Sequence, residues 1–533
     1  MLGVRSDKRT GVSTAQLTDS APVTPIPIID LFAGPGGLGE GFSSLRSRQG
    51  APVFNIALSI EKDPVAHRTL VLRSVFRQLR GSPSLALYYD YIAGKIKYEE
   101  FESSEQVAGM FATARHEARC LELGVTSPKL IDREIKARLN GNRNWVLIGG
   151  PPCQAYSLAG RSRRIRDKSF EGDQKHTLYR EYLRIVRVHK PAVFVMENVK
   201  GLLSSLHEGS SIFPLIIRDL AAPSKSVAYK LRSFVKRGDH HELVPSDFVI
   251  RAEKFGVPQS RHRVILLGVR SDIADSTQNL LIDAAKLVTV ADAIDALPKL
   301  RSRLSKSTDS PDEWVLAIKR SVRQLRLPSS DKGSVKGQMC LAINHKKTIE
   351  KVGTKLIQPL RRTKVTPIAL QAWLLDSHLN GVCQHEARSH MESDLGRYLF
   401  ASCFAKVHGR SPSLTDFPSA LLPNHKNAQQ REVGKIPFAD RFRVQCRNAP
   451  ATTIVSHIAK DGHYYIHYDP MQCRSFTVRE AARIQTFPDN YFFEGNRTEQ
   501  YTQVGNAVPP FLAVQLARIV ANLLDGTAVK EKP

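Results

Sequence analysis

Two short segments of the chain carry side chains that can act together as a nucleophile and an acid. Cys153 follows the apolar run Trp145–Ile148 and a Gly-Gly-Pro-Pro turn, and Glu197 ends a second apolar run, Val193–Met196. A cysteine is often only a small buried hydrophobe. Here two prolines fix φ and remove two N–H donors, so the chain leaves its strand in an extended turn that holds the sulfur at the sheet edge where ligands bind. We therefore expect the thiol and the carboxylate to face one site.

A third segment adds fixed positive charge. Arg261 and Arg263 stand in the sequence Gln-Ser-Arg-His-Arg, directly before the apolar run Val264–Val269. In an extended backbone alternate side chains point the same way, so the two arginines are expected to share one side. Their planar guanidinium groups suit a phosphate or a carbonyl oxygen, and a surface salt-bridge pair is the alternative.

A glycine-rich loop predicts a cofactor site at the end of the first apolar strand. The strand Pro25–Phe32 opens into the loop Ala33–Phe42. Glycines between a strand and a helix let backbone N–H groups approach a ligand closely, and the helix N-terminus adds a favourable dipole. A second apolar strand, Phe54–Ile60, ends in Glu61, where an acidic residue would meet ribose hydroxyls. We expect a ribose-containing cofactor. The loop alone suits a dinucleotide equally well, and a plain tight turn and a solvated carboxylate are the alternatives without function.

The order of apolar and amphipathic segments predicts an α/β fold with a parallel sheet. Apolar strand candidates alternate with helix-length segments such as Leu178–Val188, an order typical of β-α-β units. Further helices are expected at Arg479–Gln485 and Phe511–Leu524, and an inserted helical pair at Tyr88–Leu123. The expected parts are a flexible leader at 1–24, an α/β domain at 25–270 with an insert at about 62–144, a less regular second domain at 271–495, and a C-terminal segment at 496–533 that returns to the first domain.

The composition favours a polyanionic partner. With 77 lysines and arginines against 51 aspartates and glutamates among 533 residues, the net charge is +26. Nucleic acid is the leading candidate, because each phosphate that is neutralised releases condensed counterions. We see no apolar run of about 18 residues, no basic amphipathic helix beside an apolar anchor and no signal peptide. Seven cysteines without regular spacing indicate reduced thiols in a cytosol or nucleoid.

The region after Arg270 carries repeated basic clusters, and we expect it to track phosphates and to offer side chains to base edges. A solvated helix face is the alternative for any one cluster. The basic residues are Lys299, Arg301, Arg303 and Lys306, then Lys319, Arg320, Arg323 and Arg326, then Arg361, Arg362 and Lys364. His378, Cys383, His385 and His390 resemble a metal cluster by residue type, but their spacing matches no zinc pattern, so we expect core packing and nucleic-acid contact.

In their order along the chain, these blocks resemble the motif set of the DNA (cytosine-5) methyltransferases. The Pro-Pro-Cys-Gln and Glu-Asn-Val blocks are each moderately specific, whereas the ordered set is very specific. The resemblance frames nearly the whole chain from 26 to 524 and covers 62–144 and 271–440 weakly. The matching segments are the S-adenosylmethionine loop Asp30–Phe42, the nucleophile motif Pro151–Gln154, the carboxylate motif Glu197–Val199, the arginine motif Gln259–Arg263, the segment Ser475–Asp489 and the closing motif Gln503–Pro510.

The resemblance implies a Rossmann-like methyltransferase domain with a second, target-recognition domain, and S-adenosylmethionine as the methyl donor with no metal. It places catalytic roles on Cys153, Glu197, Arg261 and Arg263. The implied cofactor-binding residues are Phe32, Ala33, Gly34, Gly36, Gly37, Leu38, Gly39, Glu61, Pro151, Asn506 and Val508. The implied DNA contacts are Gln154, Ser157, Arg161 and Arg163, on a basic loop that is expected to be mobile.

The implied chemistry explains why these residue types occur together. C5 of cytosine becomes nucleophilic only after the Cys153 thiolate adds at C6 and breaks the aromaticity of the ring. Glu197 would supply a proton at N3, and Arg263, positioned with Arg261, would stabilise the charge at O2. Because C6 is reached from the ring face, the base must rotate out of the duplex, at a cost of a few kcal/mol.

We expect a monomer that binds double-stranded DNA in the bacterial cytoplasm, close to the nucleoid, with a cognate restriction endonuclease as a further partner and no membrane. A tRNA enzyme with the same chemistry and a non-catalytic DNA-binding regulator on the same scaffold are the alternatives. A nicotinamide dehydrogenase would leave Cys153, Glu197 and the basic domain without a role. The family usually has an acidic residue that meets the cofactor adenine amine. Asp132 stands in about that place, but its surroundings predict a helix, so it is not assigned.

Overall fold

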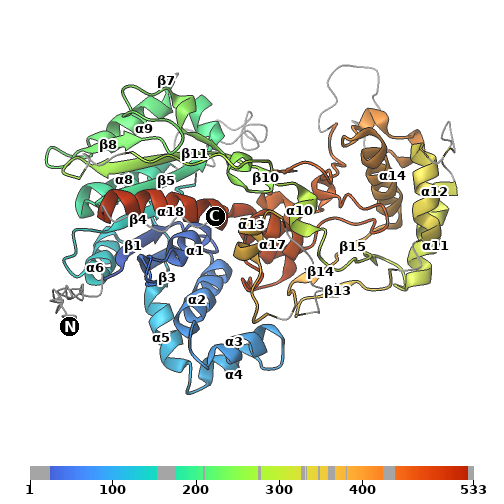
Figure 1. The fold of residues 1–533 in the computed structure, drawn as a ribbon, viewed down its shortest axis with the longest axis horizontal. Helices are drawn as coiled ribbons and strands as arrows, with labels where there is room; N and C mark the ends of the chain where they lie inside the picture. Colours follow the sequence, from blue (N-terminus) through green and yellow to red (C-terminus); the bar gives the residue numbers. More distant parts are fainter. Residues whose placement is uncertain are drawn as a thin grey trace, which may run out of the picture.

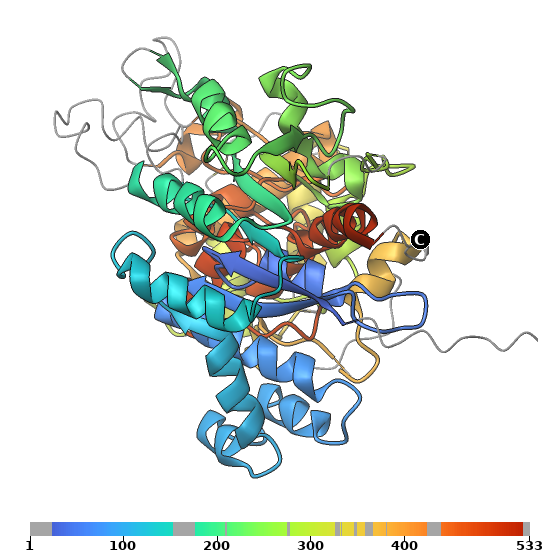
Figure 2. The ribbon, with the colours of Figure 1, turned by 90° about the vertical axis from the view of Figure 1, so that its left-hand side faces the viewer.

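The computed structural model describes most of the chain. The described residues are 24–152, 176–207, 210–273, 278–323, 325, 331, 333–345, 349–357, 366–379, 381–423 and 439–525. Figure 1 shows a lobe built on the central sheet and, beside it, a second lobe that contains most of the later helices; Figure 2 shows the sheet lobe from its own side, with the second lobe behind it.

The central sheet follows the order β3-β2-β1-β4-β5-β11-β8. Strands β1 to β5 run parallel, as predicted, whereas β11 lies antiparallel to β5, β8 and β9. The prediction of a sheet with all strands parallel is therefore wrong at β11. Only residues 252–261 separate β9 from β11, too few for a parallel crossover. The strands are β1 (Ile26–Leu31), β2 (Phe54–Glu61), β3 (Ala118–Cys120), β4 (Val146–Gly149), β5 (Val193–Val199), β8 (Tyr229–Arg232), β9 (Val249–Arg251) and β11 (His262–Arg270).

Helices cover both faces of this sheet, and the alternation of side chains along each strand explains why. Ile28 and Ile148 point to one face, which packs on α1 (Gly37–Ser44) and α18 (Pro510–Asp525). Ile29 and Leu147 point to the other face, which packs on α6 (Pro128–Leu139), α8 (His176–His189) and α9 (Ile212–Ala221). Strands that are buried on both faces are nearly continuous apolar runs. This arrangement is the α/β, Rossmann-like fold that the sequence predicts.

The insert contains three short helices, not the predicted pair. After α2 (Pro64–Leu79) come α3 (Leu85–Ile92), α4 (Tyr98–Ser103) and α5 (Ala108–Glu117), which lead into β3. Tyr88, Phe101 and Phe111 form one buried cluster with Leu379 and Phe492, far along the chain. The insert therefore connects the sheet lobe to the second lobe, below the sheet in Figure 1.

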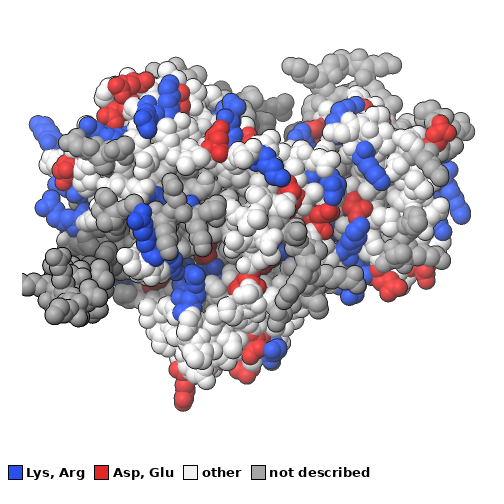
Figure 3. Space-filling model, in the orientation of Figure 1, with Lys and Arg blue, Asp and Glu red and all other residues white. Residues whose placement is uncertain are grey.

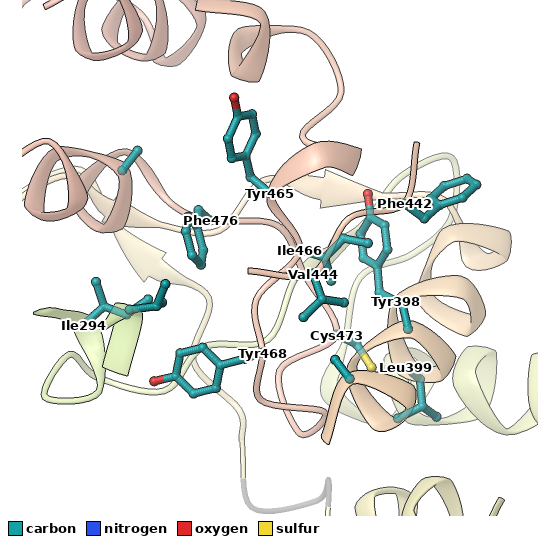
Figure 4. Packing of buried hydrophobic residues seen from close by; sticks show 14 of the residues in the cluster. Ile294, Tyr398, Leu399, Phe442, Val444, Tyr465, Ile466, Tyr468, Cys473 and Phe476 are labelled. Carbon is teal, nitrogen blue, oxygen red and sulfur yellow. The ribbon is translucent and has the colours of Figure 1, made fainter. Parts of the chain in front are cut away.

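A large apolar cluster forms the core of the second lobe, and Figure 4 shows its central residues, among them Tyr398, Phe442 and Phe476. This cluster includes Tyr501 and Val504 of α17. The division into domains remains a prediction, and this packing favours a return to the first domain just after α17, later than 496. The helices are α10 (Val290–Ile294), α11 (Pro311–Arg323), α12 (Val335–His345), α13 (Ile368–Leu374), α14 (Glu392–His408), α16 (Val478–Ile484) and α17 (Arg497–Asn506).

Buried arginines hold α16 in this core. Arg474 pairs with Glu480 at 2.6 Å, and Arg483 pairs with Asp489 at 2.7 Å, while both arginine side chains are fully buried. Thr477 caps the helix by accepting a hydrogen bond from the backbone N–H of Glu480. Because each buried charge has a partner, removing one partner would leave an uncompensated charge and destabilise the lobe strongly.

Within the described residues, one stretch, Arg497–Leu524, has the length and hydropathy to cross a membrane. It comprises α17 and α18, which are separated at Ala507–Pro509. Of its most apolar window, 72% is buried inside the protein, as in a core helix.

The contact between α1 and α18 gives a test of the fold. A Cβ placed on Gly41 would lie 2.4 Å from the Cβ of Ala513, whereas Gly109 in α5 has open space around it. We expect Gly41→Ala to lower the free energy of unfolding by about 1–3 kcal/mol, because the helices must move apart. The control Gly109→Ala should leave it unchanged or raise it slightly. Urea denaturation of both variants measures the difference. Equal stability would show that the close approach is not required.

Candidate active site

Glu197 and Arg263 meet at the carboxyl edge of the sheet. The antiparallel register pairs Glu197 of β5 with Ile265 and Arg263 of β11 with Val199. Arg263 Nε lies 2.9 Å from Glu197 Oε1, and the two side chains are only 15% and 14% exposed. The ion pair is therefore largely, but not completely, shielded from water. Partial shielding strengthens its electrostatic effect on any group that enters.

The turn after β4 leads the chain directly to this pair. A Cβ on Gly150 would lie 2.9 Å from Glu197 Oε2, so a larger residue there would displace the Glu197 carboxylate. Asn198 Nδ2 donates to the carbonyl of Pro151 at 3.2 Å, which ties the turn to β5. The next residues lie outside the described residues; they include Cys153, Gln154, Ser157, Arg161 and Arg163. Their roles stay predictions, and the described turn ends beside Glu197.

Arg261 is deeply buried, with 2% of its surface exposed. Its Nη1 donates to the carbonyl of Ile454 at 2.8 Å, across to the second lobe. Burial and the charge of Arg263 lower the pKa of Arg261 to about 9. Arg261 thus lies near Arg263 but holds a backbone carbonyl, which favours a positioning role over direct contact with a ligand.

The glycine loop has the shape expected of a cofactor cradle. Phe32, Gly34 and Gly36 all have positive φ, between 56° and 91°. A Cβ on Gly34 would meet nothing within 4 Å, so the loop faces open space at this residue. The Gly34 N–H donates to Glu61 Oε2 at 2.8 Å, which places this carboxylate at the loop.

The closing segment packs against this loop. A Cβ on Gly37 would lie 2.2 Å from the carbonyl oxygen of Val508, so only glycine permits the approach. Val508 and Leu38 are buried, while Asn506, two residues before Val508, is exposed. The structure therefore brings together the glycine loop, Glu61 and the Asn506–Val508 turn, as the sequence predicts for one binding site.

Asp30 lies next to the glycine loop, and its burial was not predicted from the sequence. It is 1% exposed at the end of β1, directly under the glycine loop. Burial, followed by the charge of Glu61, raises the pKa of Asp30 to about 8. A carboxyl group within the apolar run Ile26–Leu31 was the signal that could have revealed it.

The cysteine and histidines that resemble a metal cluster lie in different surroundings. His378 is exposed and contacts Asp376, whereas His385 is buried between Thr477 Oγ1 and the carbonyl of Pro298. Cys383 and His390 are also buried, which agrees with a role in core packing. No group of three or more potential metal ligands occurs among the residues that the structure describes.

Asp132 lies on α6, so the predicted helix is confirmed. Its carboxylate accepts hydrogen bonds from Arg184 Nη1 and contacts His189 Nε2, both at 2.8 Å. These partners occupy Asp132 on the face covered by α6 and α8, which supports leaving it unassigned to the cofactor.

Acidic neighbours neutralise several of the basic residues expected to track phosphates. Arg301 is buried and pairs with Asp309 at 2.6 Å, so a phosphate contact by Arg301 is wrong. Arg320 pairs with Glu392 at 2.8 Å on the surface. Figure 3 shows basic and acidic side chains interspersed over this lobe. Arg326, Arg361, Arg362 and Lys364 lie outside the described residues.

The raised pKa of Asp30 predicts a pH dependence of stability. The folded protein keeps Asp30 protonated up to about pH 8, whereas the unfolded chain ionises near 3.8. The stabilisation that protonated Asp30 contributes is fully present below the pKa of the unfolded chain. It is lost as the pH rises through the pKa of the folded protein. We therefore expect the midpoint of unfolding of the wild type to fall relative to Asp30→Asn between about pH 4 and pH 8, and to change no further above pH 8. A pH-independent difference between the two proteins would contradict this assignment.

Comparison with known proteins identifies the family. A family model described as C-5 cytosine-specific DNA methylase matches residues 132–522. The type II methyltransferase M.Bpa9945I of Bacillus paralicheniformis is 33% identical over 521 residues, which cover 94% of this chain and 99% of that protein. M.AgeI of Thalassovita gelatinovora is 26% identical over 92% of this chain and 98% of its own length. The DNA (cytosine-5-)-methyltransferase M.ApeKI of Aeropyrum pernix is 26% identical over 73% of this chain and 83% of its own length. This protein belongs to the family of C-5 cytosine-specific DNA methylases.

Proposed function

We propose that this DNA (cytosine-5) methyltransferase acts through a covalent bond between Cys153 and C6 of a cytosine that has been rotated out of a specific duplex sequence. Glu197 acts at N3 of the base, and Arg263 acts at O2. The observation that carries the proposal is the shielded Glu197–Arg263 pair at 2.9 Å, next to the turn that leads to Cys153.

The ion pair suits two neighbouring atoms of a cytosine ring. N3 and O2 lie side by side on the base, as the tips of Glu197 and Arg263 do in the protein. When the Cys153 thiolate forms a bond to C6, electrons move toward N3 and O2. Glu197 takes up a proton when it faces the base, and the proton that it then shares with N3, together with the charge of Arg263 at O2, lowers the energy of this addition.

The remaining steps restore the aromatic ring. Once C6 carries the sulfur, C5 is nucleophilic and would form a bond to the methyl carbon of the donor, while the bond between that carbon and the donor's sulfonium sulfur breaks and its electron pair stays on sulfur. Loss of the C5 proton and breaking of the bond between C6 and sulfur release the methylated base and the thiolate. Cys153 therefore leaves the reaction unchanged, as covalent catalysis requires.

The described residues fit S-adenosylmethionine. The glycine loop faces open space, Glu61 places a carboxylate where ribose hydroxyls can donate to it, and Asn506 is exposed at the closing turn. We assign to the cofactor site the loop residues Phe32, Ala33, Gly34, Gly36, Gly37, Leu38 and Gly39, with Glu61, Pro151, Asn506 and Val508. When bound, S-adenosylmethionine supplies an electrophilic sulfonium methyl group.

The biological setting follows from the relatives and the charge. M.Bpa9945I and M.AgeI are type II methyltransferases, which supports a role beside a restriction endonuclease in a bacterial cytoplasm. The net charge of +26 supports duplex DNA as the partner. We propose that the protein acts on this DNA as a monomer. Gln154, Ser157, Arg161 and Arg163 are proposed to contact the DNA from the loop after Cys153.

Transfer of a labelled methyl group tests the function. We expect Cys153→Ala to lower the transfer to duplex DNA by at least about 10³-fold, because the nucleophile is lost, while DNA and cofactor still bind. The control Cys340→Ala removes an exposed thiol and should keep full activity. Bisulfite sequencing of the product identifies the base. Full activity of Cys153→Ala, label on adenine or on the cytosine amino group, or preferential methylation of tRNA over duplex DNA would each overturn the proposal.

A further inference from the structure

Two buried glutamines join the cofactor side of the site to the arginine side. Gln259 and Gln485 are both fully buried, and Gln259 Nε2 donates to Gln485 Oε1. Gln259 lies on β10 (Gln259–Ser260), just before Arg261, and Gln485 ends α16. Gln259 belongs to the first lobe and Gln485 to the second, so this hydrogen bond joins the two lobes.

Gln485 holds the segment that closes the cofactor site. Its Nε2 donates to the carbonyl of Val504 at 2.7 Å and to that of Ala507 at 3.1 Å. Ala507 and its neighbour Val508 lie against Gly37 of the glycine loop. A shift of the Gln485 side chain would therefore move the backbone of the closing turn.

Gln259 holds the segment that contacts Arg261. Its Oε1 accepts from the N–H of Ile454 at 2.9 Å, and its Nε2 also donates to the carbonyl of Ile484 at 3.1 Å. The carbonyl of Ile454 in turn accepts from Arg261 Nη1. Parallel pairing of β10 with β16 (Ala451–Thr452) fixes the same two segments to each other.

The two amides use their hydrogen-bonding groups fully. All four side-chain N–H groups donate, and both side-chain oxygens accept. In a buried site, a network satisfied in this way has one preferred arrangement, and losing one member leaves donors or acceptors without partners.

We propose that Gln259 and Gln485 are positioning residues that couple the cofactor turn to Arg261, and through Arg261 to Arg263 and the flipped base. The proposal rests on the function proposed above. Ordering of the turn by bound cofactor favours the arrangement of Arg261 that receives the base, and a bound base favours the ordered turn. Coupling between two sites is reciprocal, so DNA and cofactor should strengthen each other's binding.

The experiment measures this coupling in the full-length enzyme. The dissociation constant of S-adenosylhomocysteine is determined with and without a duplex that contains a cytosine methylated by the wild type. We expect DNA to tighten binding at least about fivefold in the wild type. In Gln485→Met, which keeps the side-chain volume, this ratio should fall toward one. The kcat should fall about tenfold, because misplaced groups impair the reaction. The KM for DNA at saturating cofactor should rise by no more than the lost coupling factor, because the coupling is reciprocal.

Gln500→Met is the matched control. Gln500 is buried on α17 and donates to the carbonyls of Phe493 and Gly495, at 3.2 and 2.9 Å, and neither of these carbonyls belongs to this network. The free energy of unfolding of Gln500→Met should fall about as much as that of Gln485→Met. DNA should still tighten S-adenosylhomocysteine binding in Gln500→Met as it does in the wild type. In Gln259→Met combined with Gln485→Met, the loss of coupling should not exceed that of one variant alone. If Gln485→Met does not fold, Gln485→Asn takes its place with the same expectations.

The outcomes separate this inference from the proposed function. A wild type that transfers no methyl group to cytosine in DNA overturns the proposed function. An active wild type with equal ratios in Gln485→Met and Gln500→Met, or with additive losses in the double variant, overturns the coupling alone.

Discussion

The pairing of β11 with β5 is the constraint on which the site depends. Because β11 runs antiparallel, its first residues lie at the same edge as the last residues of β5, and Arg263 reaches Glu197. In the opposite direction, Arg263 would lie at the far edge of the sheet. Gly150 and Asn198 then fit the turn before Cys153 against the pair. An acid, a cation and the described turn that precedes Cys153 thus lie together at one edge of the sheet.

The second lobe completes this edge by holding segments that the sheet cannot supply. Paired buried arginines fix α16, and Gln485 at its end contacts both Gln259 and the turn at Ala507. Buried ion pairs contribute little net stability, since desolvation offsets their attraction, but they penalise alternative packings when one partner is displaced. We infer that this polar core specifies how the two lobes meet.

The strands and the binding loop could be predicted from the sequence, because continuous apolar runs and glycine spacing are local signals. The runs ending at Ile148 and Met196 are indeed strands, and the helix predicted at Phe511–Leu524 corresponds to α18. The ordered motifs also predicted the family correctly. The direction of β11 could not be predicted in this way, since it depends on pairing between residues distant in sequence. The same holds for Arg301. Its charge suggested a contact with phosphate at the surface, but it is buried and paired with Asp309. The roles assigned to Asp30, Gln259 and Gln485 depend on their burial, which cannot be read from composition.

The most direct test of the central claim uses duplex DNA that carries 5-fluorocytosine at the target position, because the fluorine prevents the final elimination. The enzyme, this DNA and S-adenosylmethionine are incubated, denatured and digested, and the peptides are mapped by mass spectrometry. The account predicts a stable adduct on Cys153, formed much more slowly by Glu197→Gln and Arg263→Met. No adduct, an adduct on another residue, or unchanged rates in both variants would contradict it.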